Sequence, residues 1–263
     1  MSKPPGAVQK KPSQRPTKYS DYLHLAELRA LHQPRTQQRA EGHFIGLHHV
    51  AELLFSREAE ELQEAIACLS GRDPDIPAAL LCLRRSSAIT RQLVSIFALL
   101  PELISVAEFQ AFRSELGSAS GMQSEQFRSL EILSGSQAAT TTRSGAPGAQ
   151  IHPDPLEAQV AAPNLWEAFL YAVGCRGEDV QALRDVLCSG GPGAELADAL
   201  RTHDLDWVQW RAQHAIMVEA MIGASASGTG GTSGVRYLWS RVGDRFYPIL
   251  HEATSCVHSG KLL

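Results

Sequence analysis

Residues 207–223 read WVQWRAQHAIMVEAMIG, a stretch in which large apolar side chains recur every three or four positions. Such spacing places side chains on one face of an α-helix. The face contains one histidine, His214, among two tryptophans and two methionines: Trp207, Trp210, Met217 and Met221. We therefore predict a core helix in which the imidazole of His214 is buried.

A buried histidine has two common roles. It can be a core residue whose ring is satisfied by a hydrogen bond, and an apolar face with one polar member is usually of this kind. It can also be a neutral imidazole that ligates a metal or a heme iron. From this helix alone both interpretations of His214 stay open.

A second helix with a histidine on its apolar face is predicted at residues 43–55, HFIGLHHVAELLF. The residues that share this face are Phe44, His48, Ala51 and Phe55. His48 then points into the core, whereas His49 is rotated by about 100° and points elsewhere. Glu52 follows His48 by four residues and could pair with it, which is as often structural as catalytic. Two buried histidines on two helices could face each other across a planar cofactor.

Apolar residues at helical spacing predict further helices along most of the chain. The predicted helices are a short amphipathic helix at 19–32 that begins at Ser20 or Asp21, long helices at 42–69 and 78–104, helices starting near Ser105 and Gln123, and helices at 165–173, 180–187, 194–203 and 205–222. Ser105 and Glu108 have the spacing of a capping box. No segment alternates apolar and polar residues as a strand would, so we predict an all-α bundle of long helices.

Two segments lack this periodicity. Residues 1–18 are rich in Pro, Lys and Gln, and residues 134–163 are dominated by Ser, Gly, Ala, Thr and Pro. Such compositions bury too little apolar surface to offset the entropy of ordering. We expect a flexible tail at 1–18 and a flexible inserted loop at 134–163 within a single domain at 19–263.

Two polar features could bind an anion. Arg113 lies near the apolar side of its predicted helix and needs a negative partner, either an internal glutamate or a substrate carboxylate. Residues 223–234, GASASGTGGTSG, can expose several backbone N–H groups but lack the lysine of a phosphate-binding loop. For this second segment a flexible connection is the simpler interpretation.

Composition excludes several classes of protein. The net charge of −4, with both signs scattered along the 263 residues, leaves no basic surface for nucleic acid. The five cysteines are odd in number, widely spaced and never in a C-x-x-C pair, which argues against a disulfide framework and a zinc knuckle. No apolar run approaches the ~18 residues of a membrane span. We expect a cytoplasmic protein without nucleic-acid or membrane partners.

Four motifs occur in order along the chain. They are Y-x-x-Y-L at 19–23, F-I-x-x-H-x-x-x-E-L at 44–53, F-R-x-x-L-x-x-x-S-G-x-Q-S-x-Q-F-R-x-L-E at 112–131, and W-R-x-x-H-x-x-M-V at 210–218, followed by I-G at 222–223, G-T-G-G-T-S-G at 228–234 and Y-L at 237–238. In order and spacing these motifs resemble the tryptophan 2,3-dioxygenase family, which is part of the histidine-ligated, heme-dependent aromatic oxygenases. The resemblance runs from Tyr19 to about His251, apart from 134–163.

The resemblance implies a role for each matching residue. His214 would be the axial ligand of a heme b, His48 would lie near the indole nitrogen, and Arg113 and Thr229 would hold the substrate carboxylate and ammonium. Further pocket residues would be Phe44, Phe109, Tyr19, Tyr22, Leu23 and Ser120, with Gly121, Met217 and Trp210 beside the heme. The resemblance also implies a homotetramer in which a neighbouring subunit contributes the tyrosine helix.

The sequence departs from the family pattern near the expected pocket. His49, Ala51 and Leu54 stand where the family has Gln and aromatic residues, and Phe109 stands where it often has Tyr. Ala220 replaces a common Arg, and the segment before G-T-G-G is one residue longer and lacks its usual Lys. These changes enlarge the site and make it less polar.

The implied function is insertion of O2-derived oxygen into the indole ring of L-tryptophan or a substituted tryptophan, as in a divergent biosynthetic member. One alternative is a monooxygenase of the same group, which forms a 2-oxindole from a tryptophan derivative such as a methylated one, or hydroxylates L-tyrosine. An alternative of another class is a non-catalytic heme sensor or helical binding module.

Overall fold

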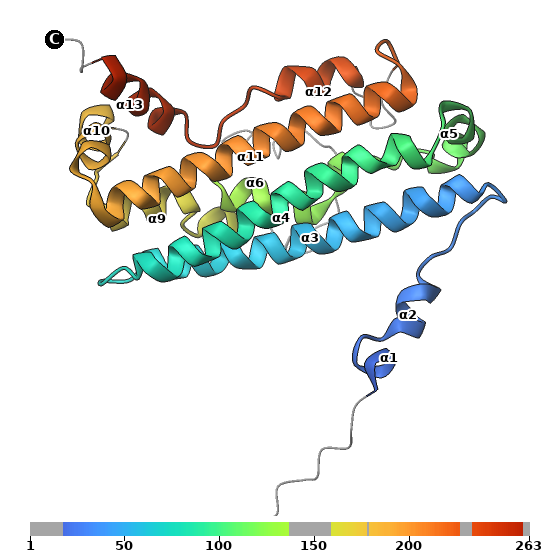
Figure 1. Cartoon of the computed structure of the whole chain (residues 1–263), viewed down its shortest axis with the longest axis horizontal. Coiled ribbons are helices and arrows are strands. Elements are labelled where there is room, and N and C mark those ends of the chain that lie inside the picture. The colour runs from blue at the N-terminus through green and yellow to red at the C-terminus, as the bar shows by residue number, and fades with distance from the viewer. Residues whose placement is uncertain (1–17, 137–158, 178, 227–232, 260–263) are drawn as a thin grey trace, which may run out of the picture.

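The computed structural model describes residues 18–136, 159–177, 179–226 and 233–259. Every regular element in these ranges is an α-helix or a 3-10 helix (Figure 1). The prediction of an all-α fold is confirmed. Almost all of the predicted tail and most of the predicted loop lie outside the described residues. Ser134, which we placed in the loop, is described and is fully buried.

Three long helices form the body of the molecule: α3 (Arg39–Leu69), α4 (Ile76–Leu103) and α11 (Gly191–Ile222). They run side by side along the longest axis in Figure 1, and α4 packs against both others. The predicted apolar stripes produce this packing. Leu62, Leu93 and Leu200 are fully buried, and each such burial stabilises the fold by about 1.5–3 kcal/mol. The turn into α4 is held by Asp75, whose carboxylate accepts a hydrogen bond from Ala78 N at 3.0 Å.

Helix α11 is continuous where the sequence predicted two helices. The apolar pattern breaks at His203 and Asp204, yet both side chains are fully buried. The carboxylate of Asp204 accepts hydrogen bonds from Phe246 N at 3.0 Å and Tyr247 N at 3.4 Å. The helix runs through this point because residues distant in sequence satisfy its polar groups.

The N-terminal segment also differs from the prediction. The expected helix at 19–32 is two short helices, α1 (Tyr19–Tyr22) and α2 (Leu25–Ala30), separated by His24 with a left-handed φ of 50°. Helix α1 starts directly after Lys18, earlier than the predicted caps. Neither helix has a buried residue. In Figure 1 they extend away from the bundle, and we call them the N-terminal arm.

The base of this arm is held to α3. Glu41 is buried, and its carboxylate accepts hydrogen bonds from Arg35 N at 2.8 Å and from Thr36 N at 2.7 Å. The ring of His32 lies over Gly42, where the Cβ of any other residue would come within 2.9 Å of His32 Nε2. Glycine at 42 therefore allows the arm to approach the bundle closely.

A compact turn follows α4. Helix α5 (Val106–Phe112) begins at the predicted capping box, in which the Ser105 hydroxyl accepts from Glu108 N at 3.3 Å. The 3-10 helices η1 (Arg113–Leu116) and η2 (Gly121–Gln123) connect it to α6 (Glu125–Leu133). We predicted this last helix from about Gln123, but Gln123 ends η2 and Ser124 caps α6.

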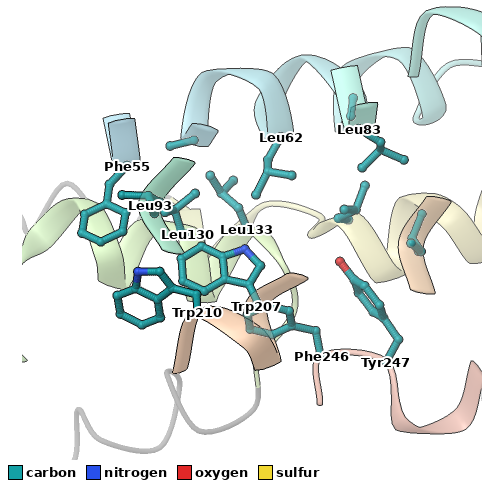
Figure 2. Close-up of a cluster of buried hydrophobic side chains, with 14 of the residues drawn as sticks. Phe55, Leu62, Leu83, Leu93, Leu130, Leu133, Trp207, Trp210, Phe246 and Tyr247 are labelled. Atoms are coloured by element: carbon teal, nitrogen blue, oxygen red, sulfur yellow. The ribbon is translucent and has the colours of Figure 1, made fainter. Parts of the chain in front are cut away.

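The remaining described helices are α9 (Leu165–Ala172), α10 (Val180–Ser189), α12 (Val235–Arg241) and α13 (Pro248–Ser259). Helices α6 and α9 pack on α3. Figure 2 shows the resulting core, in which Trp207 and Trp210 of α11 lie against Phe55 of α3 and Leu130 of α6. Within the described ranges no single helix is both long and apolar enough to cross a membrane. Only the pair Ile76–Leu103 and Val106–Leu116, bent by 92°, reaches that length and composition together.

Candidate functional site

His214 lies on α11 between two aromatic rings. Its imidazole stacks on Trp210 with ring centroids 5.2 Å apart and meets the edge of Phe97 at 5.4 Å. We predicted a buried imidazole, but His214 is half-buried, whereas Trp207, Trp210, Met217 and Met221 on the same face are buried. Burial and the nearby His48 still lower the pKa of His214 to about 4. The imidazole is therefore uncharged at neutral pH and can donate a lone pair to a metal.

His48 lies on α3, as predicted, with its ring packed on Phe44 at a centroid distance of 4.0 Å. Its Nδ1 is 2.7 Å from the carbonyl oxygen of Phe44. A carbonyl only accepts hydrogen bonds, so Nδ1 carries the proton and Nε2 keeps a lone pair in the neutral ring. Burial lowers the pKa of His48, although Glu52 raises it in part.

Phe97 of α4 connects the two histidines. It is buried, and its ring lies edge-on to His48 at 6.2 Å and to His214 at 5.4 Å. The sequence does not distinguish Phe97 from the other apolar residues of the predicted helix at 78–104. The only available signal was its size at a core position.

Three phenylalanines form one wall beside His48. Phe44 lies 5.9 Å from Phe109 and 5.7 Å from Phe112, and these two rings are 5.3 Å apart. The wall joins α3 to α5 and places Arg113, which follows directly as the first residue of η1, at its edge. Arg113 is half-buried.

The segment at 120–124 is fixed by its own caps and by α3. The Ser120 hydroxyl accepts a hydrogen bond from Met122 N at 3.3 Å, and Gly121 is exposed. The Ser124 hydroxyl donates to the carboxylate of Glu52 at 3.0 Å. Glu52, which we expected could pair with His48, therefore bonds to Ser124 and influences His48 only through its charge.

Some predicted site residues are not brought to this region. Tyr19, Tyr22 and Leu23 are 74%, 73% and 41% exposed on or beside α1. Thr229 lies outside the described residues, as does most of the G-T-G-G-T-S-G segment.

Leu54, one of the departures from the family pattern, lines a surface groove of about 410 Å³ between α3 and α4.

The donor groups present fit a heme better than a bare ion. Within the described parts of the chain, no three or more His, Cys, Asp or Glu side chains are placed to hold a metal ion. A porphyrin brings four nitrogen ligands of its own and needs only an axial histidine and apolar walls. His48 and His214, which we predicted to be buried, are both half-buried and pack on aromatic rings. Uncharged imidazoles on helices with aromatic neighbours can serve as axial ligands in all-α heme proteins.

Comparison with known proteins defines the family. A profile described as tryptophan 2,3-dioxygenase matches residues 6–146. A tryptophan 2,3-dioxygenase of Nocardioides sp. is 35% identical over 246 residues, covering 88% of this chain and 91% of the relative. Those of Burkholderia pseudomallei and Anaeromyxobacter sp. are each 33% identical over 84% of this chain, and the matches cover 78% and 88% of the relatives. The chain belongs to the tryptophan 2,3-dioxygenase family. It is thus an enzyme of a family of heme-dependent oxygenases.

Proposed function

We propose that this chain is a heme-dependent oxygenase that inserts O2-derived oxygen into the indole ring of L-tryptophan or a substituted tryptophan. Its single helical domain at 19–263 would hold heme b through His214. One observation carries the proposal: two uncharged imidazoles, from α3 and α11, both meet the ring of Phe97, with centroid distances of 6.2 Å and 5.4 Å.

His214 is the proposed axial ligand. Its lowered pKa of about 4 keeps the ligating lone pair free of a proton at neutral pH. The stack on Trp210 limits rotation of the ring. Met217 and Trp210 are buried next to it and would contribute apolar contacts, with Gly121 completing the heme environment. When bound, the heme supplies the activation of dioxygen.

His48 is the proposed partner of the substrate indole. The Nδ1 proton is held by the Phe44 carbonyl, so Nε2 is the atom that can accept a hydrogen bond from the indole N–H. Phe44 and Phe109 would pack on the ring, which excludes water and orients the substrate.

The amino-acid part of the substrate needs polar partners. Arg113, at the edge of the phenylalanine wall, would bind the carboxylate through its two-pronged guanidinium. Thr229 would contact the ammonium, and Ser120 would complete the pocket rim. Tyr19, Tyr22 and Leu23 would reach the pocket of a neighbouring subunit in a homotetramer, and their exposure on the N-terminal arm supports this.

A monooxygenase acting on a tryptophan derivative is the second candidate. The observation that favours it is the purely apolar wall at Phe44, Phe109 and Phe112, which offers no hydroxyl to the ring of the substrate. Such a wall accepts added methyl groups at little cost.

The mass of the product separates the two candidates. The chain is purified with heme, reduced, and supplied with tryptophan, 2-methyltryptophan or tyrosine under oxygen. A gain of two oxygen atoms on tryptophan supports the proposed dioxygenase, and a gain of one oxygen atom on any substrate supports the monooxygenase. If no substrate perturbs the heme spectrum and no product forms, the chain is a heme sensor and the proposal is wrong.

A further inference from the structure

A fully buried carboxyl group lies in the core of the bundle. Glu58 of α3 has no exposed surface. Three donors converge on its Oε1: Ser86 Oγ at 3.0 Å, Thr90 Oγ1 at 2.8 Å and Trp207 Nε1 at 3.0 Å. Its Oε2 makes no hydrogen bond to any residue that the structure describes. Burying a carboxyl group in such surroundings costs free energy. The packing of apolar side chains along α3 does not by itself call for a glutamate at this position.

Among the described residues, the groups that act on Glu58 are neutral donors and a negative charge. His203 of α11 has its Nδ1 3.9 Å from Glu58 Oε1, but burial lowers the pKa of His203 to about 3 and keeps it neutral. Asp206 of α11 accepts a hydrogen bond from Arg91 of α4 at 3.1 Å, and its negative charge raises the pKa of Glu58 further. The phenol of Tyr247, before α13, is neutral as well, because burial and the negative charges of Asp204 and Glu58 raise its pKa. Burial therefore raises the pKa of Glu58 to about 7.

A series of contacting aromatic rings connects this carboxyl to the candidate heme site. The indole of Trp207, which donates to Glu58, meets Trp210 at a centroid distance of 5.1 Å and an angle of 64°. Trp210 in turn stacks on His214 at 5.2 Å and 24°. Figure 2 shows the two indoles side by side, with the Trp207 nitrogen directed toward α3. Rotation of Trp207 would break its hydrogen bond and disturb the ring against which Trp210 is packed.

We propose that Glu58 is a positioning residue for His214: by fixing the indole of Trp207, its carboxyl holds Trp210 and thereby sets the orientation of the His214 imidazole. This inference rests on the proposed role of His214 as axial ligand. An ionised carboxylate accepts a hydrogen bond more strongly than a neutral acid does. The ring orientation should therefore respond to pH around neutrality, through a group that touches neither substrate nor heme.

The first test uses the full chain without heme. The carbon-bound ring protons of His214 are assigned by comparison with His214→Gln, since stacking on Trp210 gives them a ring-current shift. In the native chain we expect this shift to change with a midpoint near about 7, the pKa of Glu58. In Glu58→Gln the pH-dependent change should be lost, and in Trp207→Phe the shift should differ at every pH. The matched control is Glu41→Gln, another buried glutamate on α3 that accepts several hydrogen bonds but precedes Glu58 by 17 residues, about 25 Å along the helix.

The second test uses the heme-loaded chain. Resonance Raman of the ferrous protein should show the iron–histidine vibration displaced in Glu58→Gln and in Trp207→Phe. The double variant should show no more displacement than the larger single change, because both act through one hydrogen bond. The inference is overturned if both variants lose thermal stability while the His214 resonances of the heme-free chain match those of Glu41→Gln. If those resonances move but no iron–histidine band exists, the heme assignment fails and the coupling of Glu58 to His214 stands.

Discussion

Helix α11 carries two histidines about three turns apart. Both pack on aromatic rings and have a pKa lowered by burial, but they differ in their hydrogen bonds. His203 is fully buried, and both ring nitrogens face hydroxyl groups, Ser86 Oγ at 3.3 Å and Ser134 Oγ at 3.2 Å. His214 packs only on aromatic rings, and none of the hydrogen bonds among the described residues involves its imidazole. The first is a core histidine whose hydrogen bonds are satisfied. The second makes no hydrogen bond to a described residue, so its nitrogens can bind a ligand, although the apolar face alone favoured a core histidine for it too.

The largest expected effect tests the second histidine. We expect His214→Ala to abolish axial heme binding, because no other described imidazole shares its place on α11. Folding should change little, since the residue is half-buried and its imidazole makes no hydrogen bond to a described residue that must be replaced. Absorbance in the Soret region and a thermal melt of the same sample measure both. Full heme occupancy with an unchanged axial-ligand spectrum would contradict the assignment of His214.

The matched substitution at the first histidine should have the opposite outcome. We expect His203→Ala to lower the free energy of unfolding by about 2–4 kcal/mol, because it leaves a cavity and removes one hydrogen-bond partner from each of the buried hydroxyls of Ser86 and Ser134. Heme affinity of the folded fraction should be retained. Urea denaturation of both alanine variants provides the comparison. Equal losses of stability at positions 203 and 214 would show that the two environments are alike after all.

The pH dependence of stability should separate Glu58 from His203. The pKa of Glu58 is raised from 4.5 to about 7, so its contribution to stability is present below about pH 4.5 and is lost as the pH rises toward 7. The pKa of His203 is lowered from 6.5 to about 3, so its contribution is lost as the pH falls below about 6.5. We expect Glu58→Gln to remove the loss of stability that accompanies rising pH, which is of the order of 2–3 kcal/mol. The loss of stability at low pH, which comes from His203, should remain. Denaturant unfolding measured from about pH 5 to pH 8 tests this, and an unchanged alkaline slope would exclude Glu58 as its source.

The smallest expected effect concerns Phe97, which contacts His214 but not His203. We expect Phe97→Leu to cost about 1 kcal/mol of stability through lost aromatic contacts. The same change should alter the ring resonances of His48 and His214 and leave those of His203 in place. NMR of the heme-free chain gives both readouts. Movement of the His203 signals alone would show that the predicted separation of the two regions is wrong.

The sequence predicted most of the fold because local periodicity was sufficient for it. Helices α3 and α4 follow apolar stripes that are visible within each segment, and the capping box at Ser105 is complete within four residues. The prediction failed where distant residues decide. Helix α11 continues through Asp204 because Phe246 and Tyr247 supply donors, and no local pattern reveals that.

The candidate site was predictable from its histidines but not from what surrounds them. His48 and His214 stand out because a polar residue on an apolar face is unusual. Phe97 is inconspicuous in an apolar helix. Glu58 was overlooked, although it comes three residues after Phe55 and so lies on the same buried face of α3. Its importance arises from three donors on α4 and α11, which only the packed structure brings together.

The hydrogen bonds between Glu41 and the base of the N-terminal arm have a consequence for assembly. Because the carboxylate holds the chain at Arg35 and Thr36, the N-terminal arm is anchored at its base while its tip stays uncovered. These hydrogen bonds fix where the arm leaves the bundle. In the homotetramer proposed above, one buried carboxylate would therefore determine the side of the bundle on which a neighbouring subunit could cover Tyr19 and Tyr22.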